Sequence, residues 1–472
     1  MQTEKTVKLL GDWSLGRGAL YQRLAEAFKV AIKHRLIGEG DSLPPERQLA
    51  IALSISRSTV IKAYRQLKDE NWAASRRGSG TRINTLKANE IAAIKTTTAA
   101  RIARPALYEQ FDGNAFELID FSVSSPAMPV QLTETIQAAV SQLGGDRMYY
   151  PLGLPELREA VAVYLTAQGV STNSEQILIT TGAQQAISLI SDFYLERGDR
   201  VVIENPTYFG ALDAFRQREA KLVTFEQTGE GIALDSFERA VKAASPRFVY
   251  LTAACQNPTG YVIKKAERVV IKQICEQTGT PLISDETLID LILPPNKGRT
   301  LADSDESGNT IVLGSLSKVV WAGLRIGWIR AAENVISQLS ERKIVADLGS
   351  SLISQAVALD IFPHLETIKA ERRQELSAKR DALSVLLKTN LPDWQWQTPH
   401  GGFFLWITIP EGDAKAFSQL ARRHGVAVTP GTSMSVYNTH KRNLRITFSL
   451  DLELLESGIQ RLASAWSRYQ PS

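Results

Sequence analysis

The stretch TIVLGSLSKVVWAGLRIGW (residues 310–328) decides the fold of the larger part of this chain. It begins with a short apolar run that ends at a glycine, which is typical of a buried strand. Lys318 follows this strand directly. Burial and neighbouring charge at such a position lower the pKa of a lysine, so that it forms a Schiff base. Taken alone, a lysine is more often a solvated surface charge.

The same strand pattern recurs along the chain before this stretch. Short apolar runs alternate with amphipathic segments, of which the clearest predicts a helix over Ala183–Phe193. The runs are QILIT (176–180), RVVIE (200–204), KLVTF (221–225), RFVYLT (247–252) and PLISD (281–285). This alternation predicts an α/β domain with a mostly parallel sheet.

Two groups of residues at strand ends have the chemistry to bind one phosphate. In TTGAQQAI, Gly182 permits a tight turn and the amides of Ala183 and Gln184 open the next helix, where phosphate binds favourably. After the strand at 310–314, Ser315, Ser317 and Arg325 supply hydroxyls and a guanidinium fork. A glycine between a strand and a helix is by itself usually only a turn.

Two further polar residues follow strands. Asn257, in the segment NPTG, has a side-chain amide that can donate to a ring oxygen, although such a segment is equally an ordinary turn. Asp285 ends the run PLISD, where a buried carboxylate can keep a pyridine nitrogen protonated and make the ring an electron sink. The alternative for Asp285 is a surface carboxylate after a strand.

These segments, in this order, resemble the fold-type I aminotransferases over about Phe121 to Ser467. The resemblance implies pyridoxal 5'-phosphate on Lys318, a smaller C-terminal α+β lobe, and no metal. It implies that Tyr208 of NPTYFG stacks on the cofactor ring and that Arg445 of LRITFS binds a substrate carboxylate. It also implies that a tyrosine of YYPLGLPELREA, either Tyr149 or Tyr150, reaches the phosphate of a neighbouring subunit.

Two positions depart from that family's pattern. Thr287 and Leu288 stand where a tyrosine often binds the ring oxygen, and Ala322-Gly323 stands where Pro-Gly is common. The first departure puts efficient transamination in doubt more than cofactor binding.

Residues 10–84 predict a separate, mainly helical domain. Helical spacing of apolar residues predicts a first helix over Ala19–Ile37 that ends at Gly38. A second short helix opens at Pro44-Pro45, and a turn at Ser54–Ser56 leads to a third helix over Ser58–Glu70. The basic segment SRRGSGTRI (75–83) then predicts a hairpin.

The segment LPPERQLAIALSISRSTVIKAYRQLKDENWAASRRGSGTRI (43–83) resembles the winged helix-turn-helix of GntR-family regulators. The first residues of its second helix would face base edges in the major groove and the wing would lie at the minor groove. The residues expected at DNA are Arg47, Arg57, Ser58, Thr59, Lys62, Arg76, Arg77 and Gly80. Each arginine alone is as readily a surface charge.

Charge and composition agree with this division. Residues 1–87 contain 16 Lys and Arg against 8 Asp and Glu, a net charge of +8, so the rest has −4 within the overall +4. A small basic segment on a mildly acidic body is the pattern of a DNA-binding module. The Ala- and Thr-rich residues 85–115 predict a linker before the large domain at 116–472.

Composition also excludes several classes. No stretch reaches the roughly 18 consecutive apolar residues of a membrane helix, and MQTEKTVKLLGDW lacks the apolar core of a secretory signal. The two cysteines, Cys255 and Cys275, predict neither a disulfide framework nor a zinc site. We therefore expect a cytoplasmic protein.

Together the modules resemble the MocR subfamily of GntR regulators, whose members are typically homodimers. The resemblance implies a transcription regulator that binds a double-stranded DNA operator and senses a small amine, an amino acid or pyridoxal phosphate itself through an aldimine at Lys318. Two alternatives are an active aminotransferase with a DNA-binding domain, and a DNA-binding dimer that has lost the cofactor. The sequence names neither effector nor operator, nor whether the effect is activation or repression.

Overall fold

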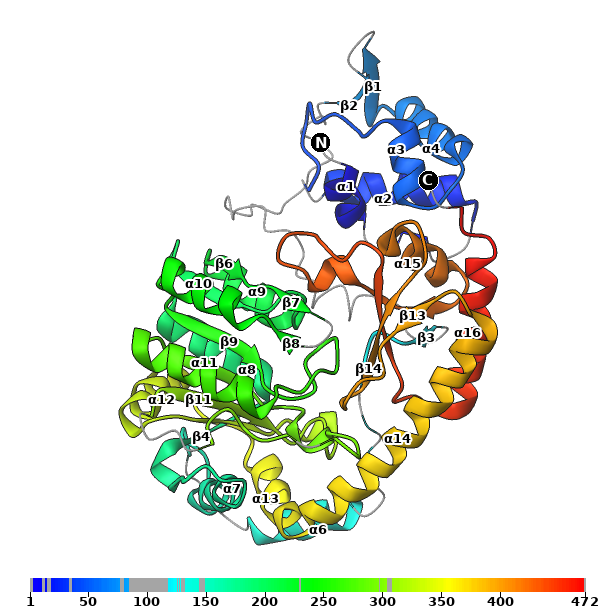
Figure 1. Cartoon of the computed structure of the whole chain (residues 1–472). Helices are drawn as coiled ribbons and strands as arrows, with labels where there is room; N and C mark the ends of the chain where they lie inside the picture. The colour runs from blue at the N-terminus through cyan, green and yellow to red at the C-terminus, as the bar shows by residue number, and fades with distance from the viewer. Residues whose placement is uncertain are drawn as a thin grey trace.

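The computed structural model describes residues 3–10, 13–14, 18–33, 36–76, 80–84, 118–124, 126, 128, 132–143, 149–228, 231–296, 298–303 and 308–470. A small helical domain lies above two lobes, a large one built on a seven-stranded sheet and a smaller one (Figure 1). The predicted linker at 85–115 lies outside the described residues.

The N-terminal domain consists of four helices and a hairpin. They are α1 Thr3–Leu10, α2 Leu20–Lys33, α3 Glu46–Ala52, α4 Arg57–Asp69, β1 Ala73–Arg76 and β2 Gly80–Ile83. Phe28 of α2 packs edge-on against Tyr64 of α4, and the Tyr64 hydroxyl donates to the carbonyl of Pro44 at 2.9 Å. These contacts hold α2, α4 and the start of α3 in one core.

The helix bounds differ from those expected by local effects. α2 ends at Lys33, not Ile37. α4 begins one residue early, at Arg57, because the Ser56 hydroxyl accepts a hydrogen bond from the Thr59 amide and caps the helix there. α1 precedes residue 10, where we placed the start of the domain, and its Val7 joins the same core.

The large lobe contains the predicted, mostly parallel sheet. Its strand order is β4-β12-β11-β10-β9-β5-β6, parallel from β11 to β6, with β12 antiparallel to both neighbours. The strands are β4 Ile177–Thr180, β5 Arg200–Ile203, β6 Lys221–Thr224, β9 Phe248–Thr252, β10 Leu282–Asp285, β11 Thr310–Ser315 and β12 Gly327–Arg330. All six predicted strands are present, which confirms the α/β fold class.

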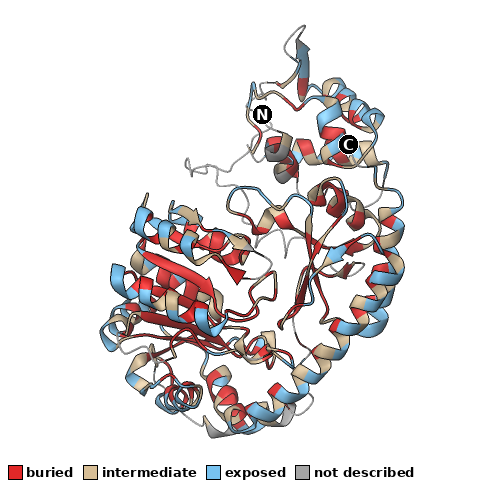
Figure 2. Cartoon of the chain, in the orientation of Figure 1, coloured by how far each residue is buried: buried red, intermediate tan, exposed pale blue. Residues whose placement is uncertain are grey.

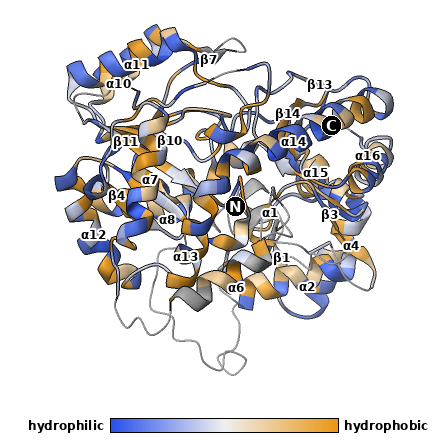
Figure 3. Ribbon diagram, turned by 90° about the horizontal axis from the view of Figure 1, so that it is seen from below, coloured by the Kyte–Doolittle hydropathy of each residue, from blue (hydrophilic) through white to orange (hydrophobic). Residues whose placement is uncertain are grey.

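Helices cover this sheet and leave its strands buried (Figure 2). Blue and orange residues alternate along the outer helices, as expected of amphipathic segments (Figure 3). The helices are α6 Leu132–Gln142, α7 Pro155–Ala167, α8 Ala183–Tyr194, α9 Phe209–Gln217, α10 Leu234–Ala244, α11 Lys265–Thr278, α12 Glu333–Asp347 and α13 Leu352–Ile361. A short hairpin pairs β7 Gln227–Thr228 with β8 Gly231–Ile232.

The small lobe follows the long helix α14 (Leu365–Asn390), which runs from α13 up to it (Figure 1). An antiparallel sheet in the order β13-β14-β17-β16 packs against α15 and α16, and β3 pairs in parallel with β15. The elements are β3 Ile119–Asp120, β13 Gln395–Trp396, β14 Phe404–Thr408, α15 Ala414–Arg423, β15 Val426–Ala427, β16 Thr429–Pro430, β17 Asn443–Thr447 and α16 Leu452–Trp466. β3 thus brings the first strand after the linker region into the C-terminal lobe.

Among the described helices, none is both long and apolar enough to cross a membrane.

The core of the N-terminal domain generates a stability prediction. Leu24 of α2 is fully buried, so Leu24→Ala is expected to destabilise this domain by about 2–5 kcal/mol through lost burial and the cavity left behind. Hydrogen exchange of α4 amides in the full chain measures opening of this domain alone. Val30→Ala is the matched control, because Val30 lies on the same helix with 45% of its surface exposed. Equal acceleration of exchange in both variants would contradict the packing described.

Candidate functional site

Lys318 lies directly after β11 and is held away from solvent. Its Nζ donates a hydrogen bond of 2.7 Å to the carbonyl oxygen of Ser124. Burial lowers the pKa of Lys318 to about 8, and the positive charges of Arg445 and Arg325 contribute to this lowering. A lysine in this state has a substantial neutral fraction near neutral pH, which is the form that attacks a carbonyl.

Asp285 lies at the end of β10, beside the start of this lysine loop. It is buried, and its carboxylate accepts from the Tyr250 hydroxyl at 2.6 Å and from the Thr287 amide at 3.1 Å. Leu288, the second departure from the family's tyrosine, is itself buried in the apolar core. The two hydrogen bonds fix the direction in which the carboxylate points.

The residues predicted to bind phosphate meet at the N-terminus of α8. Gly182 has a φ of 119°, and a Cβ there would come within 3.2 Å of the Arg325 guanidinium. Arg325 is exposed, and no ion pair or hydrogen bond of its guanidinium is found among the described residues. The Ser317 hydroxyl is buried without a hydrogen-bond partner in the described part of the chain. A helix N-terminus, a guanidinium and a buried hydroxyl together form a site suited to an anion.

Two of the predicted phosphate ligands already have protein partners. The Ser315 hydroxyl donates to the Ile326 carbonyl at 3.1 Å and accepts from the Ser317 amide at 3.2 Å. Gln184 donates through Nε2 to the Gly210 carbonyl at 3.1 Å. Ala183 is the first residue of α8 and contributes only its backbone.

Arg445 on β17 joins the small lobe to the cofactor residues. Its Nη1 donates to Asn257 Oδ1 at 2.9 Å, and its Nη2 donates to the Ser122 carbonyl at 2.6 Å. Its Nε is buried without a partner in the described residues, and none of the ion pairs found there involves its guanidinium. Since Asn257 accepts through its oxygen, its amide nitrogen is left to donate, as the predicted role requires.

Tyr208 lies among the same charged groups. Burial raises the pKa of Tyr208 to about 12, and the negative charge of Asp285 raises it too, while Arg445 and Arg325 oppose this. The predicted cofactor residues therefore come from separate strand ends into one site, and Arg445 reaches it from the other lobe.

Tyr250, Ser122 and Ser124 belong to this site and were missed by sequence reasoning. Tyr250 was recognisable in principle, because a buried tyrosine in an otherwise apolar strand needs a partner for its hydroxyl. Ser122 and Ser124 act through backbone carbonyls, which any residue type supplies.

The predicted DNA-reading edge is the first turn of α4. The side chain of Arg57 is 65% exposed and forms an ion pair with Glu46 at 3.1 Å, a contact that costs little to break at the surface. The hydroxyls of Ser58 and Thr59 each lie 2.8 Å from the Ser56 hydroxyl, within the helix cap. Lys62 is exposed one turn further along.

The remaining predicted DNA contacts lie around this edge. Arg47 is exposed on α3. Gly80 opens β2 opposite Arg76 with a φ of 76°, so a glycine suits this position of the wing. Arg77 and the side chain of Arg76 lie outside the described residues.

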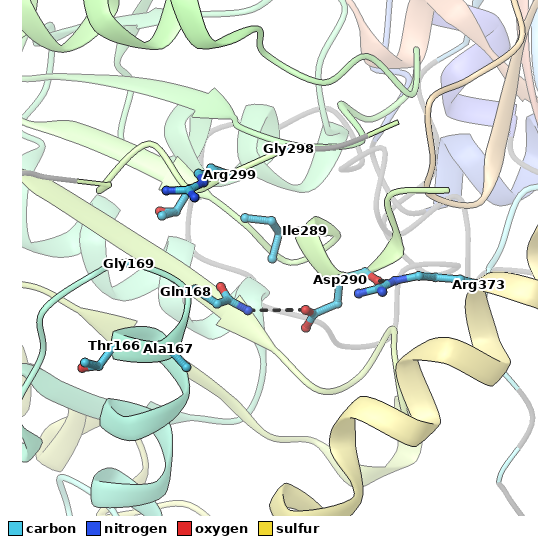
Figure 4. Close-up of a pocket in the computed structure, with 10 residues that line it drawn as sticks. Thr166, Ala167, Gln168, Gly169, Ile289, Asp290, Gly298, Arg299 and Arg373 are labelled. Carbon is cyan, nitrogen blue, oxygen red and sulfur yellow. Dashed lines mark hydrogen bonds between the residues drawn. The ribbon is translucent and has the colours of Figure 1, made fainter. Parts of the chain in front are cut away.

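A separate cavity of about 410 Å³ lies at the end of α7, away from the predicted cofactor residues (Figure 4). Asp290 faces it and is bound internally, by the Tyr164 hydroxyl at 2.7 Å and by Lys369 at 2.8 Å. Gln168 Nε2 lies 3.5 Å from the same carboxylate. These contacts tie α7 to α14, so the acidic group serves the fold here.

Comparison with known proteins agrees with this architecture. Residues 117–462 match the family described as Aminotransferase class I and II, and residues 20–83 match Bacterial regulatory proteins, gntR family. The fold and site define a regulator-type helix-turn-helix protein fused to an aminotransferase-like domain. The chain belongs to the aminotransferase class I and II family and has a gntR-family N-terminal domain, the combination expected of the MocR subfamily.

Full-length relatives share both parts. The chain is 31% identical to the Uncharacterized HTH-type transcriptional regulator YdfD of Bacillus subtilis (strain 168), over 94% of this chain and 95% of that protein. It is 26% identical to the HTH-type transcriptional regulator NorG of Staphylococcus aureus (strain N315), over 87% and 95%. The crystal structure of LysN, an alpha-aminoadipate aminotransferase from Thermus thermophilus complexed with N-(5'-phosphopyridoxyl)-L-leucine, superimposes with a TM-score of 0.70 at 27% identity, covering 77% of this chain and 94% of that one.

The lowered pKa of Lys318 generates a prediction for pH. Uptake of pyridoxal phosphate by the cofactor-free protein, followed by visible absorbance, is expected to rise with pH and to reach half its maximum near pH 8, because only the neutral amine attacks a carbonyl. Arg445→Gln removes a positive charge that lowers this pKa, so its midpoint should move to higher pH. A wild-type midpoint near the value of about 10.4 of a free lysine would refute the proposed environment.

Proposed function

We propose that this protein is a DNA-binding transcription regulator that holds pyridoxal phosphate at Lys318 and responds to a small amine, an amino acid or the cofactor itself. The observation that carries the proposal is Lys318 itself, a buried lysine flanked by Arg325 and Arg445 and lying after the strand next to Asp285. The gntR-family domain on the same chain supplies the DNA-binding part.

The residues present fit this cofactor. The unpartnered Ser317 hydroxyl, Arg325 and the glycine at the start of α8 suit its phosphate, while Asp285 suits its ring nitrogen. When bound, pyridoxal phosphate supplies an aldehyde for primary amines and a ring that withdraws electrons while its nitrogen is protonated. Asn257 would donate to the ring oxygen, and Tyr208 would lie against the ring.

Arg445 supports an effector with a carboxylate. Its guanidinium lies over the Phe404 ring, 4.0 Å from the centroid, with Nε unpartnered and buried among the described residues. Burial without a carboxylate partner disfavours a positive charge, so a bound carboxylate would relieve this cost. An amino acid has both groups that the site can recognise, an amine for Lys318's cofactor and a carboxylate for Arg445.

A homodimer is part of the proposal. Tyr149 is 74% exposed, and Val345 at the end of α12 is 89% exposed. A Cβ at Gly349 would lie 3.0 Å from the Tyr150 carbonyl oxygen, which places Tyr149 near the exposed Leu348. Exposed apolar side chains gathered in this way mark an interaction surface. Of the two tyrosines, Tyr149 is the one free to reach a second subunit, since Tyr150 packs against the core.

An active aminotransferase is the second candidate. The chain is 30% identical over 66% of its length to Aromatic-amino-acid aminotransferase 1 of Thermococcus litoralis, and its predicted cofactor residues are all present. Thr287 and Leu288 in place of a ring-binding tyrosine favour the regulator. Steady turnover with amino acid and keto acid pairs would favour the enzyme.

The cofactor role of Lys318 generates a direct test. Lys318→Ala is expected to abolish borohydride-trapped cofactor and the effect of pyridoxal phosphate or amines on DNA binding, because it removes the attaching amine. DNA affinity without effector should stay within about twofold of wild type, since the reading edge is distant. An unchanged effector response in this variant would refute sensing at Lys318.

The exposed basic edge of α4 generates a second test. Lys62→Ala is expected to weaken binding to a DNA duplex and to reduce the slope of log affinity against log salt by about 0.9, one phosphate contact's worth. Lys388→Ala, on exposed α14, is the matched control and should leave both unchanged. Equal behaviour of the two variants would exclude the proposed DNA face at Lys62.

A further inference from the structure

The turn of the helix-turn-helix is bound to the small lobe of the same chain. Arg423, the last residue of α15, donates through Nη1 to the Leu53 carbonyl at 3.0 Å and through Nη2 to the Ser54 carbonyl. The Ser54 hydroxyl donates back to the Ala416 carbonyl at 2.9 Å. Figure 1 shows α15 lying directly below the N-terminal domain.

This contact is specific. Leu53 and Ser54 follow the C-terminus of α3, where backbone carbonyls are left without helical partners and a guanidinium satisfies them well. Two residues after Ser54, the cap residue Ser56 begins α4, the helix with the predicted DNA-reading edge. The side chain of Arg423 therefore fixes the helix-turn-helix at its turn and leaves Arg57 and Lys62 exposed.

The bound face of the small lobe leads directly to the candidate effector site. α15 is followed by β15 and β16, and Thr429 of β16 lies 3.4 Å from Arg445 Nη2. β15 pairs with β3, where the Phe121 amide donates to the Ala427 carbonyl at 2.9 Å. Arg423 and Arg445 thus belong to one packed unit.

The segment after β3 is held by the two side chains to which the proposed function assigns ligands. Arg445 donates to the Ser122 carbonyl, and Lys318 donates to the Ser124 carbonyl. A lysine nitrogen bonded covalently to a cofactor keeps at most one N–H, and a guanidinium that binds a carboxylate has fewer N–H groups for the protein. Ligand binding therefore competes with both hydrogen bonds.

We propose that the Arg423 contact with the helix-turn-helix turn is the link that transmits occupancy of the cofactor site to the DNA-reading helix. Loading the site weakens the hold on Ser122 and Ser124, shifts β3 with β15 and α15, and so moves the turn that Arg423 grips. This inference rests on the proposed function, which supplies the ligand. Linkage requires the two ends to affect one another through a difference between two states.

The test measures the distance between the two domains in the full chain. Spin labels at Arg65→Cys and Lys388→Cys, both exposed positions, report α4 against α14; the natural Cys255 and Cys275 are buried. Labelled protein diluted with excess unlabelled chain reports only distances within one chain. The probe is pyridoxal phosphate alone, and its uptake is followed separately by absorbance.

Wild type is expected to give one narrow distance without cofactor and a shifted one with it. Arg423→Gln should give a broad distribution that pyridoxal phosphate no longer shifts, with uptake unchanged. Arg461→Gln is the matched control, because Arg461 donates to the Gly425 carbonyl at 3.3 Å within the small lobe, and it should behave as wild type.

Three outcomes would overturn the inference. A narrow, shifting distance in Arg423→Gln would show that this arginine does not make the link. A broad distance in diluted wild type would exclude the contact within one chain. A wild-type distance that stays fixed while the cofactor is taken up would show no transmission. Absence of uptake in every variant would instead refute the proposed cofactor, while the cofactor-free comparison would still test the contact.

Discussion

The parallel alignment of β9, β10 and β11 is the constraint on which the candidate cofactor site depends. Parallel strands place their carboxyl ends at one edge, so residues far apart in sequence arrive together there. Thr252 pairs with Asp285 and Asp285 with Leu313 in this register. Asp285 and the loop that begins at Ser315 are therefore neighbours because of strand order, and the Tyr250 hydroxyl reaches the carboxylate from the strand beside it.

Two buried cations then give the site its character. Lys318 and Arg445 come from different lobes, and burial lowers the pKa of both, while the charge of Arg445 adds to the lowering at Lys318. Each donates to a backbone carbonyl of one short segment, Ser122 to Ser124. Neutral carbonyls satisfy donors without cancelling charge, so the site retains a preference for anionic and carbonyl groups.

The arrangement of the lobes connects this chemistry to the N-terminal domain. The first strand after the linker region, β3, is completed by β15 of the C-terminal lobe, and α15 just before β15 carries the arginine that grips the helix-turn-helix turn. A regulator needs such a mechanical connection, whereas an enzyme with an appended DNA-binding domain does not. The same contact leaves the first turn of α4 exposed.

Sequence alone determined the fold class, the strands of the large sheet and the residues at their ends. Alternating apolar runs, glycines at turns and a lysine after a strand are local signals, and burial periodicity makes them readable. Only the tertiary structure decided that Arg445 bridges Asn257 and Ser122, that Tyr250 supports Asp285 and that Arg423 holds Leu53 and Ser54. Ser122, Leu53 and Ser54 take part there through backbone carbonyls, and Tyr250 from a neighbouring strand. Such contacts depend on which segments meet in space, and no residue type or spacing encodes that locally.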